Sequence, residues 1–132
     1  MKTTITFFKA CLFFMICLLS GVKSEAQTMN KGDIAFIGYN TGGQDGFAFI
    51  ALNDLPAGQT LYFTEQGWSG TQWMNTLNEP HLAYVIPPGI TCGKIISFVE
   101  TAPDVITVTG GGSVTFALGT SFNLSGGDQI IA

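Results

Sequence analysis

The stretch GDIAFIGYNTGGQDGFAFIALNDLPAGQTLYFTEQGW, from Gly32 to Trp68, decides the fold class of this chain. It contains three short runs rich in β-branched and aromatic residues, which read IAFIGY, FAFIAL and TLYFT. Each run is bounded by Gly, Asn, Asp or Pro, the residues that turn chains and end strands. No helical period competes with this pattern, so we predict β-strands over residues 34–39, 47–52 and 60–64.

The rest of the chain repeats this alternation of short strands and turn residues. Further strand-like runs cover residues 81–86, 91–99, 105–109 and 113–118. Seven or eight short strands separated by turn signals predict an all-β, antiparallel β-sandwich. The first two runs are apolar on both faces, which predicts central strands covered on both sides. The glycines at 110–112 predict a tight hairpin between the last two runs.

The first 26 residues have the features of a secretory signal peptide, with lysines near the start followed by an apolar run. Ser24 and Ala26 stand where signal peptidase requires small residues, so we predict cleavage between Ala26 and Gln27. The apolar run is shorter than the ~20 residues that span a bilayer. We therefore predict an exported protein with no membrane insertion after signal removal, and one domain over residues 27–132.

The predicted mature chain is acidic. Two lysines, Lys31 and Lys94, stand against eight Asp and Glu residues, which gives a net charge of −6 without any arginine. Nucleic acids and anionic membrane surfaces are bound by clustered Lys and Arg. We therefore expect neither as a partner.

Cys92 is the only cysteine that remains after signal removal, which leaves the domain without an internal disulfide. The apolar residues around it, in ITCGKIISF, favour a buried thiol that packs as a small hydrophobic residue. The alternatives are a disulfide with another chain or with a cysteine beyond residue 132.

Patterns of catalytic residues are missing from the sequence. His81 is the sole histidine and has no second His or Cys at ligand spacing, so we expect a structural or solvent-facing role. The sequence GWSGT differs from the Gly-x-Ser-x-Gly elbow at Thr71 and lacks its strand-to-helix context. We therefore predict no catalytic residues and no enzymatic activity.

Acidic residues at the predicted strand ends are the candidates for a metal site, and they are Asp33, Asp45, Asp54, Glu65 and Asp128. We select Asp45 and Glu65, because oxygen ligands from converging loops hold Ca²⁺. Their spacing fits no known calcium loop, so we expect them to form turns and solvated charges. No cofactor is predicted, and Ca²⁺ is the alternative.

Trp68 and Trp73 are the candidate ligand-binding residues. They belong to residues 65–80, a stretch without any sustained period that predicts a long loop. Aromatic side chains on such a loop stack on sugar rings or anchor a protein partner. The alternative is that both rings fold back and cover one end of the sandwich.

The final residues Ile130, Ile131 and Ala132 lie within a strand-like run. A strand there would leave an apolar edge with unpaired backbone groups, which natural domains normally protect. We therefore expect a sandwich that is incomplete at its C-terminal edge, in a fragment of a longer protein.

Two parts of the chain resemble known families. The segment from Gly32 to Trp68 resembles the opening module of large secreted bacterial surface proteins. The second half, IPPGITCGKIISFV followed by FNLSGGDQII, is similar to lamin tail domains, which have comparable turn residues before their strands. The resemblance covers nearly all of residues 27–132 and implies an immunoglobulin-like β-sandwich. It also implies a non-catalytic appendage of an exported protein, and it supplies no catalytic residues.

Three functions are compatible with these features. The first is a non-catalytic adhesion or interaction module of a cell-surface protein, which binds a protein or a carbohydrate through Trp68 and Trp73. The second is an accessory domain of an extracellular hydrolase whose catalytic part lies beyond residue 132. The third is a calcium-stabilised structural spacer.

Overall fold

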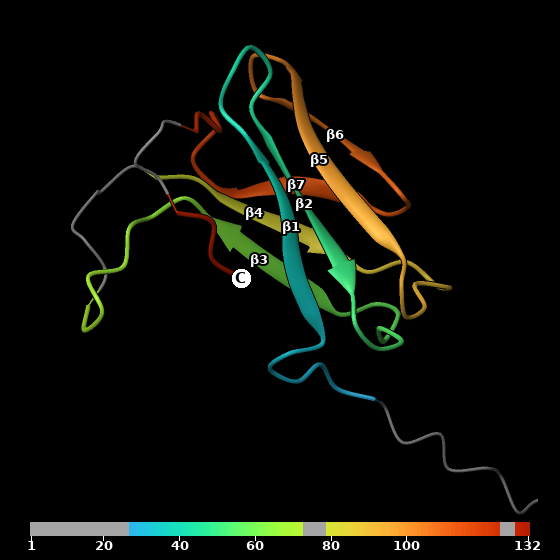
Figure 1. Cartoon of the computed structure of the whole chain (residues 1–132). Helices are drawn as coiled ribbons and strands as arrows, with labels where there is room; N and C mark the ends of the chain where they lie inside the picture. Colours follow the sequence, from blue (N-terminus) through green and yellow to red (C-terminus); the bar gives the residue numbers. More distant parts are fainter. Residues whose placement is uncertain (1–26, 73–78, 125–128) are drawn as a thin grey trace, which may run out of the picture.

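The computed structural model describes residues 27–72, 79–124 and 129–132. Within these residues the secondary structure consists of β-strands without any helix (Figure 1). The strands are β1 (Ile34–Asn40), β2 (Gly46–Ala51), β3 (Thr60–Thr64), β4 (His81–Val85), β5 (Ile95–Ala102), β6 (Val105–Thr109) and β7 (Ser113–Leu118). The predicted signal peptide, residues 1–26, lies outside the described residues.

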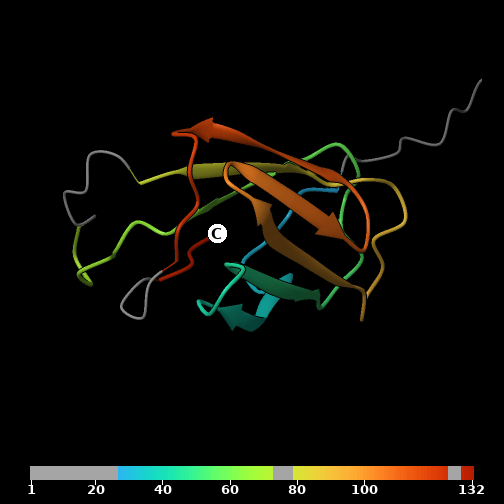
Figure 2. The ribbon, with the colours of Figure 1, turned by 90° about the horizontal axis from the view of Figure 1, so that it is seen from above.

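The strands form two antiparallel sheets that pack face to face, as the two views in Figures 1 and 2 show. One sheet has the order β1-β2-β5-β6 and the other has the order β3-β4-β7. The predicted antiparallel, immunoglobulin-like β-sandwich is therefore confirmed. Strands β6 and β7 contact each other along one side of the sandwich, whereas β1 and β3 are the edge strands of the opposite side.

The chain passes from one sheet to the other at a single end of the sandwich, which we call the crossover end. The three connections are residues 52–59, 86–94 and 110–112. Backbone hydrogen bonds tie the first two together, including the bond from the Leu55 N–H to the Ile90 carbonyl at 2.9 Å. The opposite end carries the β1–β2, β3–β4 and β5–β6 connections, and we call it the hairpin end.

The glycines at 110–112 form a crossover, so the predicted hairpin between the last two strands is wrong. All three have positive φ angles, of 103°, 122° and 83°, and they lead the chain from β6 into the other sheet. A Cβ atom on Gly112 would lie 2.5 Å from the ring of Tyr84. Strand β7 then pairs with β4, where Val114 lies opposite Tyr84.

The prediction that the first two strands are central and covered on both sides is wrong for β1 and holds in part for β2. Strand β1 is an edge strand, and its residues Ile37 and Tyr39 are 51% and 47% exposed. Strand β2 is central in its sheet, but only one of its faces points into the core. On its other face Gly46 is buried, and Ala48 and Ile50 are half-buried.

Aromatic rings dominate the core between the sheets. The largest buried side chains are Tyr84, Phe49, Phe63, Phe98 and Phe122. The rings of Phe47 and Phe98 stack with their centroids 4.7 Å apart, and Phe63 lies 5.2 Å from Phe98. Full burial of one such side chain stabilises the fold by about 1.5–3 kcal/mol. The period of two along each strand places these rings inside and leaves the alternate residues outside.

The last residues extend the three-stranded sheet beside β3 (Figure 1). The backbone groups of Ile131 and Thr64 exchange two hydrogen bonds of 3.0 Å, and Ile130 packs against the core. The backbone of Ile131 is therefore paired, in contrast to the unpaired edge expected from the sequence. The reason is that β3 is itself an edge strand and accepts this segment.

Candidate functional site

The outward side chains of β1, β2, β5 and β6 form a face on which every residue is uncharged. Strand pairing places them in three rows, which are Ala35, Ile50 and Ile95; Gly38, Ala48, Ser97 and Thr109; and Asn40, Gly46, Val99 and Thr107. We call these residues the outer face. Small residues occupy its centre, so the surface there is recessed relative to the larger side chains around it.

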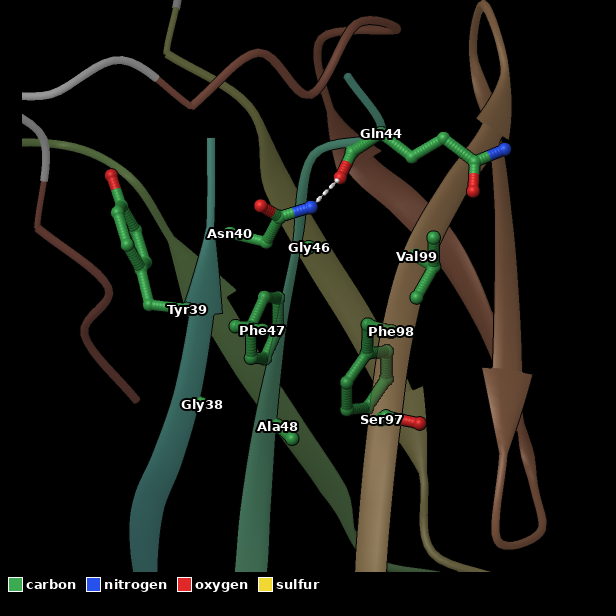
Figure 3. A pocket seen from close by; sticks show the side chains of 10 residues that line it. All are labelled: Gly38, Tyr39, Asn40, Gln44, Gly46, Phe47, Ala48, Ser97, Phe98 and Val99. Atoms are coloured by element: carbon green, nitrogen blue, oxygen red, sulfur yellow. Dashed lines mark hydrogen bonds between the residues drawn. The ribbon is translucent and has the colours of Figure 1, made fainter. Parts of the chain in front are cut away.

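A shallow pocket of about 210 Å³ lies over β1, β2 and β5 (Figure 3). The residues that create the space are Gly38, Gly46, Ala48 and Ser97, whose side chains are small or absent. A Cβ atom on Gly46 would lie 2.5 Å from the carbonyl oxygen of Phe98, so only glycine allows β2 and β5 to approach this closely. The exposed lining of the pocket is mostly apolar.

The β1–β2 hairpin loop forms one rim of the pocket. The Asn40 side-chain amide donates to the carbonyl oxygen of Gln44 at 2.6 Å, and its oxygen accepts a bond of 3.2 Å from the Gly42 N–H. These two bonds fix the loop in the way that Asn side chains commonly close turns. Figure 3 shows Tyr39 on the outside of β1, with its ring directed away from the other lining side chains.

Charged residues lie at the ends of the sandwich rather than on the outer face. Six of the seven described carboxylates lie at strand ends or in connections, and they belong to Asp33, Asp45, Asp54, Glu65, Glu79 and Asp104. The seventh, Glu100, lies within β5 opposite Ile106. Asp33, Asp45, Asp54 and Glu65 are thus beside strand ends, as expected from the sequence. The centres of protein interfaces are depleted of charge and enriched in Tyr, Trp and Met. The outer face has the first of these properties.

Trp68 lies in the loop after β3 at the hairpin end, away from the pocket lining. Its side chain is 40% exposed, and its backbone N–H donates to the Gln129 side-chain oxygen at 3.2 Å. The bond connects the loop to the segment that precedes Ile131. Trp73, the second predicted ligand-binding residue, lies outside the described residues, so the predicted pair is represented by Trp68 alone.

Asp45 and Glu65 bind two consecutive backbone amides. The Asp45 carboxylate accepts a bond of 2.9 Å from the Leu124 N–H, and the Glu65 carboxylate accepts one of 3.5 Å from the Asn123 N–H. The structure therefore brings the two predicted metal ligands to the same segment. They anchor this segment, whose Leu124 side chain is buried in the core. Among the described residues, no three His, Cys, Asp or Glu side chains are grouped as metal ligands.

Asp33 has a structural position before β1. Its carboxylate accepts a bond of 2.6 Å from the Asn30 N–H and one of 2.9 Å from the Asn53 side-chain amide. These two bonds lower the pKa of Asp33 below its ordinary value of 3.8, and the bond from Asn30 has the larger effect. Near the same end, the Gln27 side chain donates a hydrogen bond to the Asp54 carbonyl. Gln27 follows the predicted cleavage point, and Ala26, which precedes it, lies outside the described residues.

Cys92 is exposed, so the predicted buried thiol is wrong. It lies in the β4–β5 crossover, where its thiol donates to the Leu52 carbonyl at 3.1 Å. Its N–H donates to the Asp54 carboxylate at 2.9 Å. The apolar residues that suggested burial belong to β5, which begins at Ile95 and not at residue 91. Gly93, with a φ of 85°, turns the chain between them.

Reasoning from the sequence missed the outer face. Its central residues Gly38, Ala48 and Ser97 come from three strands, and only the pairing register places them side by side. The one local signal was the presence of Gly and Ala at outward positions of otherwise large apolar runs.

No family model matches this chain, and no curated protein or solved structure matches it significantly. In the part of the chain that the structure describes, there is also no helix of the length and apolarity that a membrane span requires.

Proposed function

We propose that this domain is a non-catalytic interaction module of an exported, surface-displayed protein, and that its outer face binds a protein partner. The observation that carries the proposal is the uncharged outer face with a pocket at its centre. The signal-like residues 1–26 support export. The resemblance to the opening modules of bacterial surface proteins supports a role outside the cell.

A protein is favoured over a carbohydrate as the partner. The exposed lining of the pocket is mostly apolar, which suits an aliphatic side chain of a partner. Sugar rings usually stack on an exposed aromatic face, and Tyr39 points away from the pocket in Figure 3. Ile95, which is 50% exposed, extends the apolar part of the face toward the crossover end.

Binding of the labelled mature protein to intact cells of the source organism tests this proposal. Ser97→Lys places a charge in the pocket, and because Ser97 points outward the core is unchanged. We expect it to weaken binding at least about tenfold, the effect of an unpaired charge in an apolar contact. The matched control is Thr115→Lys, an exposed position of β7 on the other sheet, and we expect it to bind as the wild type does.

Equal binding by the two lysine variants would contradict the proposal. Loss of binding in Trp68→Ala, with Ser97→Lys still active, would instead place the site on the loop at the hairpin end. The folded state of each variant is checked first by its thermal unfolding curve.

A further inference from the structure

A second pocket, of about 430 Å³, lies at the hairpin end, and we call it the end pocket. It is bounded by Gly43 and Gln44 of the β1–β2 loop, by Glu100 and Thr101 of β5, and by Ser121 and Asn123 after β7. Its exposed lining is as polar as it is apolar, in contrast to the mostly apolar pocket of the outer face.

The two pockets adjoin at Gln44, which lines both of them. Figure 3 shows the Gln44 side chain directed from the β1–β2 loop toward β5. Along β5, Ser97 in the first pocket and Glu100 in the end pocket are three residues apart, or about 10 Å at the rise of a strand. One extended segment of three to four residues therefore reaches from one pocket to the other.

Glu100 provides the charge of the end pocket. Of the described residues that line this pocket, it alone has an ionisable carboxylate. One oxygen of this carboxylate accepts a bond of 3.2 Å from the Asp104 N–H, which holds the half-buried side chain at the β5–β6 turn. An ionised carboxylate accepts several hydrogen bonds, so it can also bind an ammonium or guanidinium group of a partner.

The charges of the two ends of the sandwich differ. In the described residues the hairpin end has five carboxylates, which belong to Asp45, Glu65, Glu79, Glu100 and Asp104. Lys31 and Lys94, the two lysines of residues 27–132, both lie at the crossover end. The outer face therefore adjoins an end that is negatively charged. Such a surface attracts partners of positive charge and repels those of negative charge.

A second copy of the domain does not provide this chemistry. Residues 27–132 have a net charge of −6, so two copies repel each other at the negative end. Lys31 and Lys94 also lie in hydrogen-bonded turns. The Asp33 N–H bonds to the Asn30 carbonyl, and the Lys94 N–H bonds to the Thr91 carbonyl. Neither lysine therefore belongs to an extended segment that could cross both pockets.

We propose that the pocket of the outer face and the end pocket together bind an extended basic segment of the partner protein. The proposal rests on the proposed function, because it names the chemistry of the partner that the outer face binds. The segment places an aliphatic side chain over Ala48 and Ser97, and a Lys or Arg three residues away beside Glu100. The apolar contact provides affinity, and the carboxylate selects the positive charge.

The test is an NMR titration of the isotope-labelled mature protein with the acetylated and amidated peptide Lys-Ser-Ser-Ile-Ser-Ser-Lys. This peptide has a lysine three residues from isoleucine in either chain direction. At millimolar peptide we expect saturable shifts of the amide signals of Ala48, Ser97 and Glu100. A peptide with Gly in place of Ile should bind about tenfold more weakly, because it leaves the apolar pocket empty. A peptide with Glu in place of both lysines should bind at least about tenfold more weakly, because like charges then meet at Glu100.

Glu100→Gln is the decisive variant. It removes the charge and keeps an oxygen that accepts the bond from the Asp104 N–H, so we expect it to stay folded. It should bind the lysine peptide about threefold more weakly, as loss of a partly exposed ion pair does. Glu79→Gln is the matched control. It changes the net charge equally at the hairpin end but lies before β4, outside the end pocket, and should bind as the wild type does. Thermal unfolding curves check the folded state of both variants.

Three results would overturn the proposal. They are the absence of saturable shifts at the three amides, equal binding of the Ile and Gly peptides, and equal effects of Glu100→Gln and Glu79→Gln. The last would show only a general attraction of cations to an acidic protein. The proposed function would survive each of them if Ser97→Lys still weakened binding to cells. Conversely, selective peptide binding together with unchanged cell binding by Ser97→Lys would contradict the proposed function alone.

Discussion

The hydroxyl group of Tyr84, on β4, donates a hydrogen bond of 3.0 Å to the carbonyl oxygen of Gly111, in the last crossover. The Tyr84 side chain is fully buried, and its ring meets that of Phe98 edge-on at 87° with 5.2 Å between centroids. Burial raises the pKa of the Tyr84 hydroxyl above its ordinary value of 10. One side chain therefore joins the aromatic core to the turn that returns the chain to the three-stranded sheet.

We expect Tyr84→Phe to lower the free energy of unfolding at neutral pH by about 0.5–1.5 kcal/mol, the net value of one hydrogen bond. The wild type should also lose stability at alkaline pH through ionisation of Tyr84, whereas the variant has no hydroxyl to ionise at this position. Because the pKa of Tyr84 is raised in the fold, the associated stability is present below pH 10 and is lost as pH rises through the folded pKa. Urea unfolding over a series of alkaline pH values measures both effects. If the wild type and Tyr84→Phe lost equal amounts of unfolding free energy at alkaline pH, Tyr84 would not be the residue responsible.

Asp33 should contribute to loss of stability in acid. Its two hydrogen bonds lower its pKa, so the stability it provides is present above pH 3.8 and is lost as pH falls through the lower folded pKa. Asp33→Asn should therefore reduce the dependence of unfolding free energy on pH in this acidic range. Asn53→Ala removes one of the two bonds and should give an intermediate slope. If unfolding free energy depended on acidic pH as steeply in Asp33→Asn as in the wild type, Asp33 would not contribute to the loss of stability in acid.

The Asp45 carboxylate should stabilise the fold through its bond to the Leu124 N–H. Asp45→Ala leaves this half-buried amide without its acceptor, and we expect a cost of about 1–3 kcal/mol. Asp45→Asn keeps an oxygen in the same place and should cost less than half as much. Urea unfolding of the three proteins gives the comparison. If Asn and Ala are equally destabilising, the charge rather than the hydrogen bond is important.

Gly112 should tolerate replacement by alanine poorly. Its φ is 83°, and a Cβ atom would lie 2.5 Å from the Tyr84 ring. Gly89 is the matched control, because its φ is 85° and no atom lies within 4 Å of an added Cβ. We expect Gly89→Ala to cost about 1 kcal/mol from its backbone conformation alone. Gly112→Ala should cost about 1–3 kcal/mol more from overpacking. Similar melting temperatures of Gly112→Ala and Gly89→Ala would show that the Tyr84 ring moves aside without cost.

Calcium should leave the melting temperature unchanged. The carboxylates of Asp45 and Glu65 accept bonds from two consecutive amides, and Ca²⁺ would have to compete with these bonds. Thermal unfolding in millimolar CaCl₂ and in EDTA provides the measurement. A rise in melting temperature that grows with Ca²⁺ concentration, and disappears in Asp45→Asn, would instead support the calcium-stabilised spacer.

The sequence predicted the positions of strands well where the signal is local. The predicted runs 60–64, 105–109 and 113–118 coincide with β3, β6 and β7. These runs have period-two patterns between turn residues, and both properties are readable from a few neighbouring positions. Strand β5 was displaced by several residues, because the turn at residues 91–94 is defined by a Lys94 N–H bond to the Thr91 carbonyl and not by composition.

The candidate sites were much less predictable. Trp68 was correctly expected on a loop, but the pocket of the outer face joins Gly38, Ala48 and Ser97, and none of the three is distinctive in the sequence. Its place depends on a bulge in β1 between Phe36 and Gly38, which shifts the register by one residue. Such long-range register is decided by packing of the whole sheet.

The amino-acid sequence by itself determined that this is an all-β sandwich of short antiparallel strands, because this property follows from side-chain period and turn chemistry. Only the tertiary structure decided which sheet each strand joins. The glycines at 110–112 are equally compatible with a hairpin and with a crossover, and the choice depends on burial of Val114 and Phe116 beside β4. The same packing placed the small residues Gly38, Ala48 and Ser97 side by side on the outer face.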